Sequence, residues 1–228
     1  MLVQPTQETA RLISAIREKT KGVKMNSESP SCAGKEIKGA MHIFSTDLLQ
    51  GCSYFSFQAQ KVDTEEEIRF FNTACIVFAT SIIESKINEW ISISSTIAET
   101  EVPEEFWKTL DSIKKDLSIQ EKWNLIASLN GGTMWDGSKE PFQSFNLITA
   151  LRNELVHYKG HFLGKDEVPI KKIKDLMAKF KIKSSATFTE DDVSCWISDL
   201  LNEPKVSEWV AKRINDFHVQ VIPLLGIH

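Results

Sequence analysis

The chain has 228 residues and a formal net charge of −4, with 42% hydrophobic and 25% charged residues. This composition is typical of a globular protein and excludes a fibrous or wholly disordered chain. Because the charge is small and negative, the whole molecule has no electrostatic attraction to nucleic acid or to acidic membranes. Any such affinity must come from a local patch.

Cysteine usage and apolar run lengths bear on the cellular compartment. Cys32, Cys52, Cys75 and Cys195 form no CxxC pair and no zinc-finger spacing, which predicts reduced thiols rather than a disulfide framework. The N-terminal residues lack the apolar stretch of a signal peptide. The longest nearly apolar run, 74–83, is about half the length that a membrane span requires. We therefore expect a cytoplasmic protein with no membrane association.

Helical spacing of apolar residues dominates the first part of the chain. A short helix is expected over 6–20, followed by a small, polar linker at 24–36. Apolar side chains then recur at steps of three and four residues and predict a long helix over 36–60. These side chains are Ile37, Met41, Phe44, Leu48, Cys52 and Phe55.

The next helix is expected at the centre of the fold. Thr64 and Glu67 fit a capping box, which predicts a helix start, and the pattern continues to about residue 97. Between Ala74 and Ile83 this helix is apolar on all sides. Such a helix is expected to be surrounded by others.

Two shorter helices and a loop follow. Pro103 opens the first helix, and a capping box of Ser118 and Glu121 begins the second. The loop at 130–141 contains glycines and is long enough to suggest a functional role. The other tryptophans are expected in the core, but Trp135 lies in this loop and could stack on a base.

The last part of the chain is also helical. A helix is expected over 142–158, with Gly160 ending it. A lysine-rich helix over 169–181, a helix capped near Thr189 and a last helix over 204–223 complete the pattern. Strand patterns are weak, so the predicted fold class is all-α.

The helix over 142–158 has a broad apolar arc that contains an arginine. The arc consists of Phe145, Ile148, Leu151, Leu155 and Tyr158. Arg152 falls inside it and must find an acceptor, because burying an unpaired guanidinium costs free energy. Glu84 is the best candidate partner and Glu89 the second.

Asn153 and His157 are four residues apart and share the opposite side of this helix. On spacing alone, two interpretations stay open. Arg152 could form a structural ion pair while Asn153 and His157 belong to a solvated face, or the three residues could form a functional site.

The stretch LRNELVHY resembles the signature of the HEPN (higher eukaryotes and prokaryotes nucleotide-binding) domain superfamily. That signature is an Arg followed, after roughly four to six residues, by a His. Here four residues separate Arg152 from His157, and Asn153 fills the polar position that often follows the Arg. In that family the motif lies near the end of a late bundle helix, after a long central helix such as the one expected here.

The resemblance covers roughly residues 36–160 and implies a helical bundle of HEPN type over that range. Residues 1–35 would then form an N-terminal helix and flexible linker. Residues 161–228 would form a C-terminal helical addition packed on the bundle.

The resemblance implies a metal-independent endoribonuclease that needs no cofactor, commonly a homodimer with two facing motifs. Such a protein could be the toxin or effector of a defence or toxin–antitoxin system, with RNA as substrate and an antitoxin as partner. Members of the family can also be non-catalytic binding or dimerisation modules. A further alternative is a partner for a nucleotidyltransferase, which would predict a heteromer.

The side chains suit RNA cleavage through the 2′-hydroxyl. His157 could act as general base or acid, because an imidazole has an unperturbed pKa of about 6.5. Arg152 could hold the phosphate and Asn153 could position it, with Glu84 and Tyr158 in support. Arg152 and His157 point about 140° apart around their helix. A facing second copy could bring both onto one phosphate.

A basic stretch near the motif supports an RNA substrate. Residues 171–183 contain six lysines and one acidic residue. With neighbouring basic residues they could follow a phosphate backbone. The candidate RNA-binding residues are Lys159, His161, Lys165, Lys171, Lys172 and Lys174. The alternative is that these lysines are the solvated side of an amphipathic helix.

Other chemistries have weaker support. His157 and His161 are four residues apart, as zinc ligands can be, but Gly160 breaks the helix between them and no acidic third ligand is near. We expect no metal site. The sequence contains no P-loop, no GxGxxG and no GxSxG motif.

Overall fold

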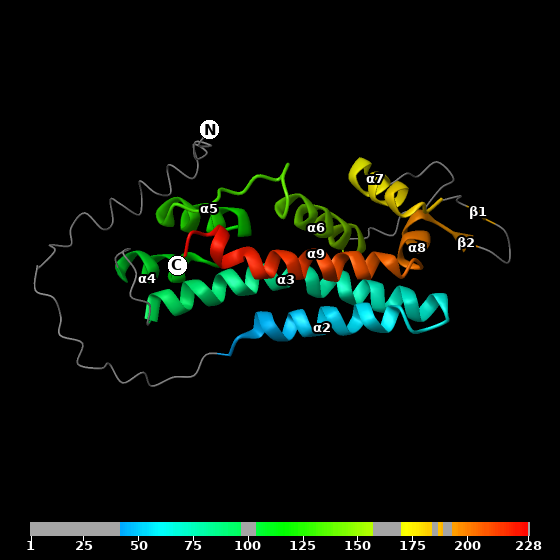
Figure 1. Cartoon of the computed structure of the whole chain (residues 1–228), viewed down its shortest axis with the longest axis horizontal. Helices are drawn as coiled ribbons and strands as arrows, with labels where there is room; N and C mark the ends of the chain where they lie inside the picture. The colour runs from blue at the N-terminus through cyan, green and yellow to red at the C-terminus, as the bar shows by residue number, and fades with distance from the viewer. Residues whose placement is uncertain (1–41, 97–103, 157–169, 184–186, 189–192, 228) are drawn as a thin grey trace, which may run out of the picture. The chain divides into compact units, whose positions relative to one another are not determined.

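The computed structural model describes residues 42–96, 104–156, 170–183, 187–188 and 193–227. Within them the chain forms eight helices and one pair of two-residue strands (Figure 1). Their bounds are α2 Phe44–Ala59, α3 Glu65–Thr96, α4 Glu104–Ile113, α5 Ile119–Asn130, α6 Phe142–Val156, α7 Lys171–Phe180, β1 Thr187–Phe188, β2 Val193–Ser194, α8 Trp196–Leu201 and α9 Lys205–Leu224. The predicted all-α class is confirmed.

Most predicted helices agree with the structure to within a few residues, and α3 and α9 each do so at both ends. The predicted N-terminal helix and linker lie outside the described residues. So do the limits of the predicted domains, at 35/36 and 160/161. The three-part division of the chain therefore stays a prediction.

The predicted start of the second helix at residue 36 is wrong. His42 and Ile43 precede the helix, and α2 begins at Phe44. Apolar spacing shows which face of a helix packs, but it does not show where the first free backbone N–H groups lie. Asp47 in the first turn, near the positive end of the helix dipole, was the better indicator of this start.

The predicted helix start near Thr189 is also wrong. Thr189 itself lies outside the described residues, but the segments on either side pair as antiparallel strands, Thr187 with Ser194 and Phe188 with Val193. The next helix, α8, begins only at Trp196. Its start is stabilised by the backbone N–H of Cys195, which donates to Ser198 Oγ at 3.0 Å.

The chain divides into two compact units. The first, here the α4–α5 unit, contains Lys86–Met134 and the residues from Ile222 on. The second, here the α6–α9 unit, contains Ser45–Ser85 and Trp135–Val221. Helices α3 and α9 each contribute residues to both units.

In the α6–α9 unit, α2 lies against α3 at close range (Figure 1). The Cys52 and Cys75 Sγ atoms are 3.5 Å apart and both residues are fully buried. A Cβ on Gly51 would lie 2.7 Å from the ring of Phe78, so only glycine permits this approach. Buried Asn72 then ties α3 to the end of α8, because its Nδ2 donates to the carbonyl of Leu201 at 2.6 Å.

The three described cysteines, Cys52, Cys75 and Cys195, are free thiols. The hydrogen bond with the Cys52 thiol, together with burial, raises the pKa of the Cys75 thiol far above its usual range. A thiol that does not ionise is a poor nucleophile. This pair therefore packs as part of the core.

The prediction that α3 is enclosed on all sides is wrong for one face. Ile76, Ala79 and Ile83 are fully buried, but Ala74 and Val77 are half-buried and Phe70 is 63% exposed. The half-buried side chains line a shallow apolar groove along this face. An apolar sequence does not by itself show how many neighbours a helix has.

By length and composition alone, Glu65–Ser94 of α3 could cross a membrane, and it is the one stretch among the described residues that passes this test. Core helices of soluble proteins pass the same test. The fully buried Ile82, Ile87 and Ile91 fit a core helix. A cytoplasmic location stays a prediction.

In the α4–α5 unit, the chain end is held by close backbone contacts. The predicted Ser118–Glu121 capping box is present at the start of α5. Trp123 Nε1 donates to the carbonyl of Thr133 at 2.7 Å, and the Thr133 backbone N–H donates to the carbonyl of Leu224 at 2.7 Å. The segment after α5 therefore pairs directly with the end of α9.

Gly132 makes this pairing possible, and replacing it with alanine should break it. A Cβ there would lie 2.5 Å from the carbonyl oxygen of Leu225 and 2.6 Å from that of Leu224. We expect Gly132→Ala to lower the free energy of unfolding by about 1–3 kcal/mol. Hydrogen exchange should show that the Thr133 amide loses its protection.

Gly131→Ala is the matched control. Gly131 has φ +69 and nothing within 4 Å of an added Cβ. Alanine there costs only backbone strain, about 1 kcal/mol, and should leave the Thr133 amide protected. Equal loss of protection in both variants would contradict the contact that we assign to Gly132.

Candidate nucleic-acid interface

The start of α6 is fixed by a side-chain cap from the preceding loop. The Glu140 carboxylate accepts hydrogen bonds from the Ser144 hydroxyl at 2.7 Å and from the Ser144 backbone N–H at 3.3 Å. A carboxylate at the first turn also stabilises the helix dipole. One step earlier, Asp136 accepts from the Ser138 hydroxyl and backbone N–H, which closes a tight turn. These hydrogen bonds in the loop therefore fix the position at which α6 begins.

An aromatic cluster holds the first half of α6 on α9. The rings of Phe142 and Phe145 lie 5.5 and 5.7 Å from the ring of Phe217, and Trp135 packs on Phe142 at 4.6 Å. Trp135 is only 8% exposed. The prediction that Trp135 could stack on a nucleic-acid base is therefore wrong, because its ring is already covered by protein.

The predicted apolar arc of α6 is largely confirmed. Phe145, Ile148 and Leu151 are buried, and Leu155 is half-buried. The last member of the arc, Tyr158, lies outside the described residues. This arc turns the opposite side of α6 toward solvent.

Arg152 and Asn153 lie in the last turn of α6, near solvent. Arg152 is half-buried and Asn153 is exposed. Arg152 Nη1 donates to Asn153 Oδ1 at 3.0 Å. Glu84 is exposed on α3, and among the described residues the expected Arg152–Glu84 ion pair does not form. The sequence placed Arg152 inside the packed arc, but its long side chain reaches solvent, so a buried partner is not required.

The hydrogen bond between these residues determines what they present outward. Asn153 Oδ1 accepts the hydrogen bond from Arg152. The two N–H donors on Asn153 Nδ2 therefore take no part in this bond. The remaining guanidinium N–H groups are also donors, and a guanidinium has no acceptor. Within the described structure the pair therefore presents donors and an uncompensated positive charge, which is the complement of a phosphate.

The remaining residues of the motif and its basic neighbours lie outside the described residues. These are His157, Tyr158, Lys159, His161 and Lys165. Their predicted roles stay predictions.

Helix α7 carries the described part of the basic stretch. Lys171, Lys172 and Lys174 are exposed, while Ile173 and Leu176 on the other side are buried. The helix is therefore amphipathic, as the alternative interpretation requires. Its first turn has two unusual properties, however: it has no side-chain cap and no acidic residue.

Lysines at the start of a helix lie near the positive end of the helix dipole, where cations are unfavourable. The backbone N–H groups of Ile173 and Lys174 donate to the carbonyl of Ile170, and those of Lys171 and Lys172 are donors that a helix start leaves without an intrahelical partner. An anion at this position would relieve both costs. The first turn of α7 is therefore a candidate anion-binding position, beside the alternative that its lysines are the solvated side of an amphipathic helix.

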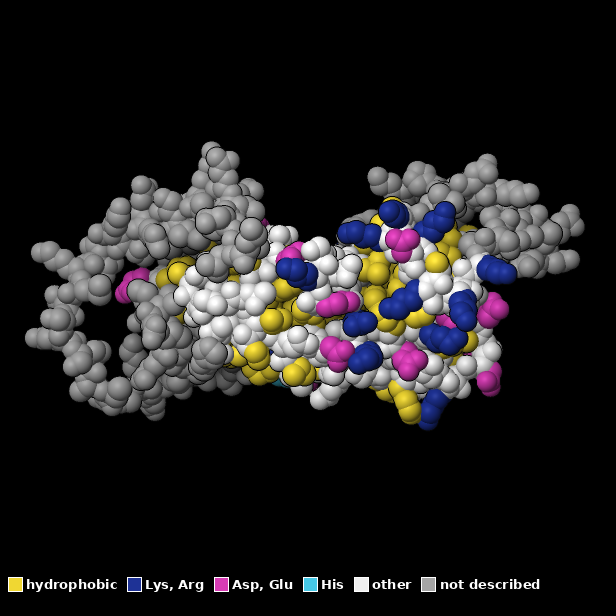
Figure 2. Space-filling model, turned by 45° about the horizontal axis from the view of Figure 1, so that its top comes forward, with side chains coloured by type: hydrophobic (Ala, Val, Ile, Leu, Met, Phe, Trp, Pro, Cys, Tyr) yellow, Lys and Arg dark blue, Asp and Glu magenta, His cyan; other side chains and the backbone are white. Residues whose placement is uncertain are grey.

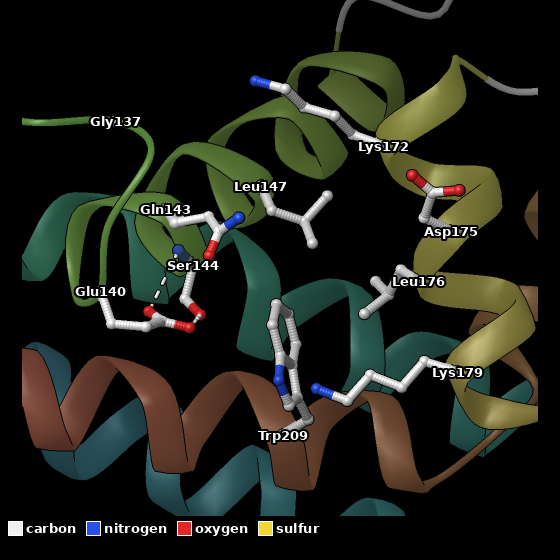
Figure 3. A pocket seen from close by; sticks show the side chains of 10 residues that line it. All are labelled: Gly137, Glu140, Gln143, Ser144, Leu147, Lys172, Asp175, Leu176, Lys179 and Trp209. Atoms are coloured by element: carbon white, nitrogen blue, oxygen red, sulfur yellow. Dashed lines mark hydrogen bonds between the residues drawn. The ribbon is translucent and has the colours of Figure 1, made fainter.

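Helices α6 and α7 lie side by side (Figure 1). Together with α9 they line an open pocket (Figure 3). The pocket has a volume of about 280 Å³. Figure 2 shows Lys and Arg side chains over this part of the molecule, with some Asp and Glu among them and apolar side chains visible between them. Of the residues that line this pocket, only Lys172 was predicted from the sequence as a site residue. Trp209 on α9 is the most informative of the others, because the sequence pattern favours the core for every tryptophan except Trp135.

The sequence of α9 does contain a signal that Trp209 is partly exposed. The buried residues of α9 include Val206, Val210, Ile214 and Phe217. Trp209 lies beside this stripe rather than in it, and it is half-buried. A large aromatic residue at the edge of a buried stripe indicates a partly exposed ring.

Among the described residues, no group of three or more His, Cys, Asp and Glu side chains could hold a metal ion. The chain matches no protein-family model, no curated protein and no solved structure. The resemblance of the Arg152–His157 motif to HEPN domains therefore stays a hypothesis from the sequence.

The turn before α6 should respond to acid. Hydrogen bonds from the Ser138 hydroxyl and backbone N–H, and then the Lys139 ammonium, lower the pKa of Asp136 from its ordinary 3.8 to about 2. A lowered pKa means that the charged carboxylate stabilises the folded turn above about pH 4 and that this contribution is lost as pH falls toward 2. Carbon-13 NMR of the carboxyl group should show titration near pH 2.

Ser138→Ala removes the first-named cause of the shift while it leaves the backbone N–H in place. The pKa of Asp136 should then rise toward its ordinary value. Ser128→Ala, on another element, is the control and should leave this titration unchanged. An Asp136 carboxyl that titrates identically in all three proteins would show that the turn does not form as described.

Proposed function

We propose that the protein binds RNA on the surface formed by α6 and α7 and cleaves it through the 2′-hydroxyl without a metal ion. The observation that carries this proposal is the Arg152–Asn153 pair. Arg152 is half-buried and bonded to a neutral amide, so its guanidinium charge is available to a phosphate oxygen. The exposed lysines and uncapped first turn of α7 give further support.

The reaction requires one bond to form and one to break. The 2′-oxygen attacks the phosphorus atom, and the bond from phosphorus to the 5′-oxygen breaks. The products are a 2′,3′-cyclic phosphate and a 5′-hydroxyl. The 2′-hydroxyl loses a proton and the leaving 5′-oxygen gains one, so the site needs a group that accepts and donates protons near neutral pH.

In this proposal His157 transfers the protons, and Arg152 and Asn153 bind the phosphate oxygens. Donors held at the phosphate stabilise the charge that develops as the 2′-oxygen attacks. A helical continuation of α6 to His157 would turn that side chain about 140° away from Arg152, so in this proposal the complete site uses two copies of the chain. Arg152 of one copy would then act with His157 of the other, as in a toxin or defence nuclease that works as a homodimer.

A second candidate function is a non-catalytic dimerisation or docking module, including a module for an antitoxin or a nucleotidyltransferase. The groove on α3 favours it, because Phe70 is 63% exposed beside half-buried apolar side chains. An exposed apolar face often marks a protein contact. The two candidates differ in whether RNA is cut.

The first experiment is cleavage of a mixed RNA pool in the presence of EDTA. We expect the wild type to produce ends with 2′,3′-cyclic phosphate. His157→Ala should lower the rate by about 10²- to 10⁴-fold, the usual contribution of general acid–base catalysis. Arg152→Lys keeps the charge but loses the planar fork, and should lower the rate at least about tenfold.

Matched controls change the same residue types elsewhere. His42→Ala alters an exposed histidine and Arg69→Lys a half-buried arginine on α3, and both should cut at the wild-type rate. If the wild type does not cut RNA, the nuclease proposal is wrong and the docking module is the remaining candidate function. Cleavage that is equal in all variants would show that the activity does not belong to this motif.

The lysines of α7 should determine the salt dependence of RNA binding. Each lysine that contacts a phosphate of a single strand contributes about 0.7 to the slope of log K against log salt concentration. Replacing Lys171, Lys172 and Lys174 with glutamine should therefore lower the slope by about 2. Fluorescence anisotropy with labelled RNA at several salt concentrations measures it.

The control is the same number of substitutions at exposed lysines elsewhere, one on α4 and two in turns: Lys61, Lys108 and Lys115 to glutamine. Both triple variants change the net charge by the same amount. An equal loss of slope in the two variants would mean that general charge, not the α7 surface, governs the binding.

A further inference from the structure

The pocket between α6, α7 and α9 has an apolar floor and a polar rim. Figure 3 shows the indole of Trp209 rising from α9 below Leu147 and Leu176, with Gln143 on the α6 side. Lys179 points from α7 toward the indole, and its Nζ lies 5.7 Å from the ring centroid. A flat, partly exposed aromatic face therefore lies between two aliphatic side chains and a cation.

Trp209 also carries a donor that the protein does not use. Its Nε1 is buried, and within the described structure it has no hydrogen-bond partner. Because this atom is buried, a molecule in the pocket would contact the exposed face of the indole rather than this N–H.

The charges of the rim favour an anion. Glu140 lines the pocket, but it accepts hydrogen bonds from Ser144 and lies 3.8 Å from Arg213 Nη1, which offsets its charge. The other charged groups of the rim are Lys172, Lys179 and Asp175, so two lysines stand against the one carboxylate that Arg213 does not offset. In Figure 3 Lys172 extends from the first turn of α7 across α6.

Size limits the occupant to one ring system. The volume of about 280 Å³ lies just below the range of sites for drug-sized ligands, which begins at about 300 Å³. A planar, heteroaromatic ring with an attached anion fits the indole face and the lysines. An unpaired nucleobase with its phosphates has this chemistry.

We propose that this pocket binds one unpaired base of an RNA strand, which stacks on Trp209. Lys172 and Lys179 contact the flanking phosphates. The inference rests on the RNA-binding part of the proposed function and names its substrate class, which is single-stranded RNA.

Duplex RNA cannot enter, since its bases are paired and stacked inside the helix. The base held on Trp209 would also fix the strand relative to Arg152 and Asn153, because α6 carries both this pair and one wall of the pocket.

The test compares binding of intact and abasic RNA. All proteins carry His157→Ala, so that the RNA stays uncut, and circular dichroism establishes that each is folded. Trp209→Leu should weaken binding of a single-stranded oligomer about tenfold, whereas Trp209→Phe keeps a stacking face and should bind nearly as well. An abasic oligomer of the same length should bind both variants equally.

Tyr54→Leu is the matched control, because Tyr54 is 55% exposed on α2 and does not line the pocket. Equal binding of single-stranded RNA by Trp209→Leu and by this control would overturn the inference. A second result would also overturn it: a free nucleoside monophosphate binds in a way that depends on Trp209, whereas RNA binding does not depend on Trp209. That result would assign the pocket to a small molecule.

Failure of this inference can be distinguished from failure of the proposed function. If cleavage requires His157, and Trp209→Leu changes neither cleavage nor RNA binding, the pocket inference is wrong and the nuclease proposal stands. If RNA binding depends on Trp209 but the protein with His157 intact cuts no RNA, the nuclease proposal is wrong and the pocket inference stands.

Discussion

The packing of α6 on the aromatic cluster of α9 is the constraint on which the candidate interface depends. Phe142 and Phe145 contact Phe217 on one side of α6, and the Glu140 carboxylate fixes where the helix begins. Once its start and its buried side are set, the helical period determines every later position. Arg152 must then emerge at the solvent edge. Loss of the cluster would move the donor pair and the pocket together.

Local chemistry explains why much of this fold was predictable from the sequence. The Ser118–Glu121 capping box and the spacing of apolar residues are short-range features, and the structure contains the helices that they indicate. The predicted start of α2 and the helix predicted near Thr189 were wrong because these local patterns do not determine backbone hydrogen bonding. A periodic pattern can extend beyond the backbone hydrogen bonds that define a helix, and a short strand pair leaves little trace in a sequence.

Tertiary surroundings decided the features that the sequence could not give. Trp135 lies in a loop, which suggested exposure, but three phenylalanine rings lie within ring-contact distance and cover it. Trp209 lies in a helix, which suggested a core position, but it occupies the edge of the buried stripe and lines a pocket. The open face of α3 is a third case. In each, exposure depends on which elements are neighbours, and no local pattern specifies that.

A net charge of −4 argued against nucleic acid as a partner of the whole molecule, yet the surface of α6 and α7 argues for one. The two statements are compatible because charge acts locally: at physiological salt, exposed charges farther apart than about 8 Å are largely screened from each other. An anion at the first turn of α7 would meet lysines and free backbone donors rather than the average charge. Acidic residues elsewhere oppose non-specific binding of polyanions. Under the proposed function, a local donor surface on a mildly acidic protein would therefore favour selective RNA binding over general attraction to polyanions.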